Sequence, residues 1–187
     1  MDEIEDSTLG ENELTFEIGR LVRRAVELDG WLNGLWKLLA GPVAGAALPR
    51  GTRDVIDGIV KMLGQVEIEE DLRALCVEAV KDAGRAVERR GQLIHERWVR
   101  ASGLEDIGWT ATISNKNRAH PLWSLDDFRA ATEQLDRAAF KLLAIESVVA
   151  PNTPLTPFGE DFLVSLLKGK FQLDGRGQIA SLSWPDA

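Results

Sequence analysis

Arg90 and His95, in the segment VERRGQLIHERWVR, are the residues of this sequence whose types and spacing best suit chemistry. The ordinary pKa of histidine lies close to neutrality, so an imidazole can accept or return a proton at physiological pH. A guanidinium stays charged and offers a planar fork of donors that matches a phosphate. The pair therefore suits a reaction in which a proton moves while negative charge builds on a phosphate.

Both residues stand near the end of a helix that the sequence predicts from about Ile68 to Ala101. At about 100° per residue, its apolar side chains fall on one stripe, which comprises Cys76, Val80, Ala83, Val87, Ile94 and Trp98. Arg90 lies inside this stripe, and His95 lies at its edge on the line of Glu88. Because an unpaired buried charge costs several kcal/mol, we expect Arg90 to be paired, to extend its charge to solvent or to face an interface.

Four further helices are predicted around this one. Apolar residues recur at spacings of three and four in each, which indicates one buried face. Thr52 and Ser124 stand where a helix N-cap is expected, whereas Gly30 and Gly34 weaken the first helix and allow a kink or a close crossing. The predicted spans are 12–40, 52–64, 124–149 and 160–167.

The sequence as a whole predicts an all-α, antiparallel bundle of four to five helices with a short β-hairpin after the third helix. IGWTATISNKNRAHPLW alternates around a turn at Asn115 to Asn117, which predicts that hairpin. Residues 1–11 are acidic and lack periodicity, so we expect a mobile tail. The helical domain covers 12–150. Residues 151–187 hold the proline-rich link PNTPLTP, the short helix and a tail whose Ile179, Leu182 and Trp184 indicate docking.

The segment Arg90, Gly91, Gln92, Leu93, Ile94, His95 resembles the motif of the HEPN superfamily of four-helix and five-helix proteins. That motif has an Arg, usually a polar residue, three more residues and a His, late in a long helix. The surroundings are similar to a bacterial branch of the superfamily in the order of EIGRLVRRAVELDGWLNGLWKLLAG, TRDVIDGIVKML, ERRGQLIHERWV and a helix that opens with SLDDF. The resemblance covers about residues 12–150.

This resemblance implies a metal-independent endoribonuclease, a toxin or defence effector, in which two motifs meet across a homodimer and a partner protein neutralises the activity. No cofactor is implied. His95 is then the general base that takes the proton of a ribose 2'-hydroxyl, and Arg90 is the phosphate clamp. Arg89 and Arg97 assist with contacts to the RNA backbone.

Gly91 departs from the superfamily pattern, which usually has Asn, Asp or His at that position. A glycine cannot hydrogen-bond the imidazole or the phosphate through a side chain. Gln92 or Glu88 could replace that group, although Glu88 could equally form a structural ion pair with His95. Two alternatives therefore stay open: a catalytically inactive helical module that binds RNA or a protein, and a dimeric scaffold without a ligand.

Other residues with chemical potential have simpler explanations. Cys76 lies on the apolar stripe and is expected in the core, and His120 precedes a proline in a loop. One Cys and two distant His give no metal-ligand spacing. Among the tryptophans, Trp31, Trp36 and Trp98 are expected in the core or the dimer seam. Trp109 and Trp123 flank the hairpin, where stacking on RNA bases is the alternative to packing.

Charge and hydropathy restrict the partners and the compartment. The net charge of −8 means that the whole molecule is not drawn to nucleic acid or to an anionic membrane, so an RNA surface must be a local patch. No stretch approaches the roughly 18 apolar residues of a membrane span, and the acidic start lacks the basic flank of a signal peptide. With a single cysteine, the chain is expected in the reducing cytoplasm.

Overall fold

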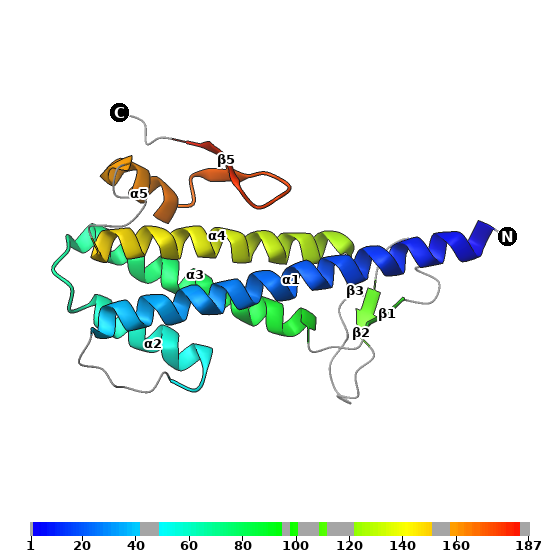
Figure 1. The fold of residues 1–187 in the computed structure, drawn as a ribbon, viewed down its shortest axis with the longest axis horizontal. Helices are drawn as coiled ribbons and strands as arrows, with labels where there is room; N and C mark the ends of the chain where they lie inside the picture. The colour runs from blue at the N-terminus through cyan, green and yellow to red at the C-terminus, as the bar shows by residue number, and fades with distance from the viewer. Residues whose placement is uncertain are drawn as a thin grey trace.

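Five helices pack together in the part of the chain that the computed structural model describes, residues 2–41, 49–94, 98–100, 109–111, 122–150 and 158–183. Figure 1 shows the long helices lying side by side, with the C-terminal segment on one side of them. The predicted all-α bundle is confirmed. The helices are α1 (Asp2–Ala40), α2 (Thr52–Leu63), α3 (Glu70–Ile94), α4 (Leu125–Val149) and α5 (Glu160–Leu167).

Helix α4 lies at the centre and packs against α1, α3 and α5, whereas α2 packs against α1 and α3. Glu17 of α1 pairs with Arg129 of α4. Two turns further along both helices, Arg24 pairs with Asp136. These contacts show that α1 and α4 run in the same direction, while α3 runs opposite to both (Figure 1). The bundle is thus antiparallel at α1/α3 and α3/α4, and parallel at α1/α4.

The core lies where the apolar faces of the helices meet. Full burial of a Leu, Ile, Val or Phe side chain stabilises a fold by about 1.5 to 3 kcal/mol, so these contacts dominate its stability. Cys76 is fully buried, as predicted, whereas Val22 of α1 is 39% exposed. The largest fully buried side chains are Leu21, Leu28, Leu32, Ile59, Leu63, Val80, Leu93, Phe128, Leu135, Leu142, Ile145 and Leu166.

The start of the first two helices differs from the prediction. Helix α1 begins at Asp2 and not near residue 12, so the segment predicted as a tail is helical. Extending a helix that packing has already nucleated adds one hydrogen bond per residue, and acidic residues suit its N-terminal end. This end of α1 projects past the other helices (Figure 1). At α2, Gly51 is the N-cap and makes no side-chain cap, so Thr52 is the first helical residue and not the cap.

Helix α3 ends earlier than predicted. Its last residue is Ile94, and a strand β1 (Trp98–Arg100) follows where the sequence predicts helix up to Ala101. Trp98 is therefore not part of the helical stripe. The segment WVR has strong β propensity, and pairing with β2 (Trp109–Ala111) supplies the backbone hydrogen bonds that the helix would have made.

The predicted hairpin is present as part of a three-stranded antiparallel sheet with the order β1-β2-β3. Strand β2 pairs with β3 (Leu122–Trp123), and Trp109 lies opposite Trp123. The predicted turn at residues 115–117 lies outside the described residues. Ser124 then caps α4 as predicted, because its hydroxyl and the Asp127 carboxylate form a capping box.

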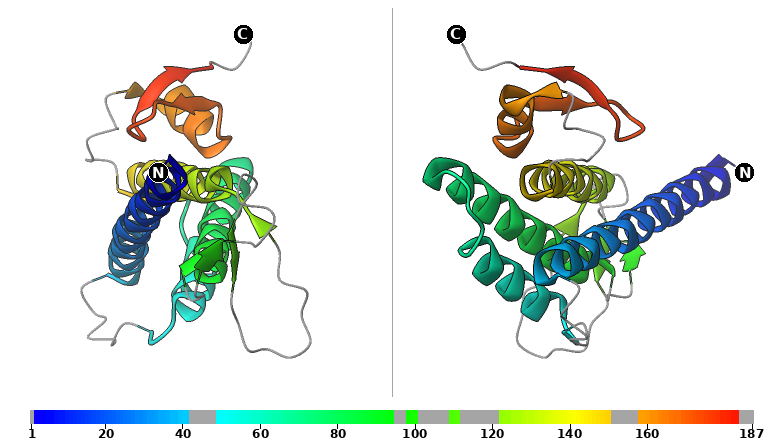
Figure 2. Two further views of the ribbon diagram at one scale, coloured as in Figure 1. Left: turned by 90° about the vertical axis from the view of Figure 1, so that its right-hand side faces the viewer. Right: turned by 60° about the vertical axis from the view of Figure 1, so that its left-hand side comes forward.

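The C-terminal segment docks on the bundle, and it does so as a hairpin that the sequence analysis did not predict. Strand β4 (Phe171–Leu173) pairs with β5 (Ile179–Leu182) after α5, which has the predicted bounds. Phe171 is buried, and both ends of β5 pack partly against the core. The two views in Figure 2 show the hairpin and α5 on the same side of α4. The sequence LDGRGQ carries an Asp-Gly turn signal that could have revealed it.

Candidate functional site

Arg90 lies on the last turns of α3 and points its charge at α1. Its side chain is 20% exposed, and Nη2 stands 3.5 Å from Oδ2 of Asp29. The Nε atom is buried and has no hydrogen-bond partner among the described residues. Arg90 is therefore paired, as its place in the apolar stripe requires, and within the described residues this is the one ion pair that it makes.

Asp29 belongs to two features of this region. Besides facing Arg90, it lines a cavity of about 190 Å³ between α1 and the start of α2. Asn33 of α1, Arg50 just before α2 and Thr52 at the start of α2 line the same cavity. An anion that binds Arg90 must compete with the Asp29 carboxylate or share the guanidinium with it.

Arg89 contacts both an aromatic ring and a carboxylate within the chain. Its guanidinium lies over the ring of Trp123, 4.0 Å from the centroid, and Nη2 stands 3.5 Å from Oδ1 of Asp127. Trp123 is buried, so packing describes it better than base stacking does. Arg89 thus connects the end of α3 to the capped start of α4.

The residues next to Arg90 are open to solvent or to a partner. Gln92 and Glu88 are exposed, and Gly91 is half-buried. A Cβ built on Gly91 meets no atom within 4 Å, so the described part of the chain leaves room for a side chain there. Close packing within the chain therefore does not explain this glycine.

His95 and Arg97 lie outside the described residues, and so does His120. The structure does bring Arg89, Arg90 and Gln92 to the end of α3, directly before His95 in the chain. The geometry of the Arg90 and His95 pair stays a prediction.

Packing explains the positions of most of the other tryptophans and of the cysteine. Trp36 is half-buried and packs beside Gly58 of α2, whereas Trp31 is 39% exposed. Cys76 is fully buried, and desolvation raises its pKa to about 12. Its thiolate is thus inaccessible at neutral pH, which confirms the core interpretation. No group of His, Cys, Asp and Glu side chains in the described ranges is arranged to hold a metal ion.

The sequence analysis missed a buried polar cluster between α1 and α4. Glu17 is 4% exposed and accepts from both Arg20 and Arg129, at 3.3 and 3.2 Å. Its place in an acidic segment gave no signal of burial. Two turns further on, Asp136 is buried beside Arg24, with Oδ1 at 2.9 Å from Nε.

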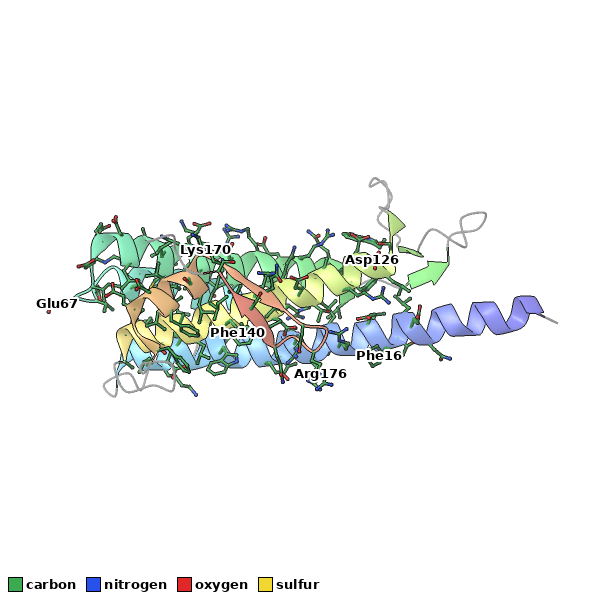
Figure 3. All side chains as sticks on the ribbon, turned by 90° about the horizontal axis from the view of Figure 1, so that it is seen from above. Phe16, Glu67, Asp126, Phe140, Lys170 and Arg176 are labelled. Atoms are coloured by element: carbon green, nitrogen blue, oxygen red, sulfur yellow. The ribbon has the colours of Figure 1, made fainter. Side chains whose placement is uncertain are left out.

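The tip of the β4–β5 hairpin covers this second ion pair. Arg24 donates to the carbonyl of Arg176, and Arg20 donates to that of Gly175; Figure 3 shows Arg176 at the tip, next to α1. Gly177 has φ of 75°, and a Cβ there would stand 2.3 Å from Oδ2 of Asp136. Desolvation raises the pKa of Asp136 to about 6, although the charge of Arg24 opposes the shift. The hairpin tip thus covers a titratable carboxyl group.

Comparisons of this chain with models of protein families, with curated proteins and with solved structures found no match. Over the described residues, no helix is both long enough and apolar enough to cross a membrane.

Proposed function

We propose that this protein is a metal-independent endoribonuclease of HEPN type that acts as a homodimer, with Arg90 and His95 as its catalytic pair. The contacts of the Arg90 guanidinium are the observation that supports this function most strongly. Among the described residues, Asp29 is the one ion-pair partner of the Arg90 guanidinium, at 3.5 Å, and the buried Nε has no partner. A phosphate oxygen is the acceptor that this set of donors suits best.

The reaction follows from the two side chains. His95 removes the proton of a ribose 2'-hydroxyl, whose oxygen attacks the adjacent phosphorus. The new bond between the 2'-oxygen and phosphorus replaces the bond to the 5'-oxygen, which leaves with the proton that His95 returns. The products are a 2',3'-cyclic phosphate and a 5'-hydroxyl. Arg90 stabilises the charge on the non-bridging oxygens while this exchange takes place.

The proposal includes a two-fold dimer in which the end of α3 lines the interface. Gly91 and Gln92 make no close packing contact with the described residues and leave this surface accessible to a second copy. In a two-fold arrangement the same surface meets itself, so two Arg90 and His95 pairs would share one cleft. A neutralising partner would act by covering this cleft.

A second candidate is a catalytically inactive module of the same fold that binds RNA or a protein. Two observations favour it. Arg89 contacts Trp123 and Asp127, and these partners compete with a contact to RNA. Gly91 supplies no polar side chain beside the motif.

Cleavage of single-stranded RNA in the presence of a chelator separates these candidates. We expect the wild-type protein to cut RNA without metal, and His95→Ala to abolish the cleavage while its circular dichroism spectrum and dimer mass stay unchanged. Equal cleavage by both proteins would assign the activity to a contaminant. Binding of RNA without cleavage by either protein would favour the inactive module.

A further inference from the structure

A second pocket lies away from the end of α3, between the middle of α3, the middle of α4 and the turn that follows α5. Its volume is about 400 Å³, which is within the range of small-molecule sites of roughly 300 to 1,000 Å³. Arg85 of α3 and Arg137 and Lys141 of α4 line it, together with Asp82 and Gly169. Neither the motif nor the proposed cleavage uses any of these residues.

The lining of the pocket carries more positive than negative charge, although two carboxylates beside it pair with its arginines. Three cations line it against one carboxylate, whereas the chain as a whole has a net charge of −8. Asp82 is shared by two of these cations, since it accepts from Lys141 at 2.5 Å and also from Arg85.

Further charged residues lie beside the pocket. Lys168 and Lys170 are exposed on the adjoining turn, and Figure 3 shows Lys170 on the side of α3. Glu78 and Glu133 pair with Arg85 and Arg137 outside the lining.

The cations are held in position before any ligand arrives. Lys141 is 15% exposed and is fixed by Asp82. Burial alone would raise the pKa of Asp82, but hydrogen bonds from Lys141 and Arg85 outweigh it and lower this pKa below its ordinary value. Arg137 donates to the carbonyl of Phe171 at 2.8 Å and lies over its ring. Side chains that are already ordered lose little entropy on binding, which favours affinity.

Gly169 keeps the mouth of the pocket open. It has φ of 69°, a conformation that favours glycine, and a Cβ at this position would stand 3.5 Å from Cε of Lys141. Any larger side chain would therefore extend toward the Lys141 ammonium group and shield it from a ligand.

We propose that this pocket binds the phosphate group of a nucleotide-sized ligand. The fork of Arg85 and the compact charge of Lys141 are the donors that recognise a phosphate, and Arg137, whose nitrogens contact Glu133 and the carbonyl of Phe171, adds positive charge. The ligand is a free nucleotide or the phosphorylated end of an RNA strand, which offer the same group. The proposal does not depend on RNA cleavage, so it can hold if the motif at the end of α3 is inactive.

Titrations followed by ¹H–¹⁵N NMR of the full chain test the proposal. The probes are inorganic phosphate, adenosine 5'-monophosphate, adenosine, and oligouridine with or without a 5'-phosphate. We expect phosphate and the monophosphate to shift the amide signals of Gly169 and of Ala86 and Ala138, which form the pocket floor, while adenosine does not. If, besides phosphate and the monophosphate, the 5'-phosphorylated oligouridine gives this response and the unphosphorylated one does not, RNA ends are also ligands. A response to neither phosphate nor the monophosphate would overturn the proposal.

Arg85→Gln provides the specific variant and Arg23→Gln its control. Arg85 is 58% exposed and Asp82 keeps Lys141 after the change, so the fold should persist. Arg23 is 72% exposed on α1 and pairs with Glu27. Arg23→Gln therefore removes the same charge as Arg85→Gln, but away from the pocket. We expect affinity for the monophosphate to fall about tenfold in Arg85→Gln and to stay unchanged in Arg23→Gln, as for the loss of one charge-assisted hydrogen bond. An equal effect of the two variants would show long-range charge attraction and no site.

Discussion

Asp136 should make the stability of this protein depend on pH in the direction opposite to most native carboxylates. It is buried under the tip of the β4–β5 hairpin, and its charged form lacks water. The perturbation is Asp136→Asn, which keeps the size of the side chain and removes its titration. Arg24 keeps Glu27 and the carbonyl of Arg176 as partners in the variant.

The size of the effect follows from the pKa of Asp136, which burial raises to about 6. Because an ordinary aspartate has a pKa near 4, the folded state binds more protons than the unfolded state between about pH 4 and pH 6. The free energy of unfolding therefore falls as the pH rises through this window and levels off above it. From about pH 5 to pH 8 the expected loss is about 1.4 kcal/mol. Solvent screening reduces it little, since the side chain is 7% exposed.

Urea unfolding at several pH values measures this difference. The stability of Asp136→Asn relative to the wild type should be greater at about pH 8 than at about pH 5 by about 1.4 kcal/mol. Asp126→Asn is the control, because Asp126 lies on the same helix with its side chain 85% exposed. A stability difference between Asp136→Asn and the wild type that is constant with pH would refute the assignment of the buried charge.

Two glycines give further predictions. Gly91→Asn should be neutral or stabilise the fold by up to about 1 kcal/mol, since a Cβ there has nothing within 4 Å. If the change raises RNA cleavage, it restores the missing polar group; if sedimentation instead shows a weaker dimer, the glycine serves the contact with a second copy. Gly177→Ala should destabilise the protein by about 2 kcal/mol or more, because of its positive φ and the clash with Asp136. Thermal unfolding checks it, and an unchanged midpoint would contradict the docked position of the hairpin tip.

The periodicity of apolar residues was sufficient to predict the helices, because each helix packs one apolar face against the core. Helix α5 has the predicted bounds, and α4 begins one residue after the predicted cap Ser124. Local propensity alone could not locate the end of α3, since the strand β1 forms by pairing with residues nine to thirteen positions further along the chain. The same limit applies to α1, whose first turns extend a helix that packing elsewhere holds in place.

The candidate site was predicted in part. The expectation that Arg90 needs a partner followed from its place in an apolar stripe, but the identity of that partner depended on how α1 crosses α3. No sequence pattern links Arg90 to Asp29, 61 positions away, or Glu17 to Arg129. Arg89 shows the opposite case: a basic residue beside the motif is engaged by an aromatic ring that the hairpin brings to it.

The most direct test of the proposed function is the rate of RNA cleavage by Arg90→Gln, with Arg89→Gln as the matched control. Both changes remove one positive charge from the last turns of α3. We expect Arg90→Gln to lower the cleavage rate by about 100-fold to 1,000-fold with the fold intact, as for the loss of a donor to a charged transition state. Arg89→Gln should chiefly lower stability, because Arg89 contacts Trp123 and Asp127. Unchanged cleavage by Arg90→Gln, or no cleavage by the wild type, would contradict the proposed role of Arg90.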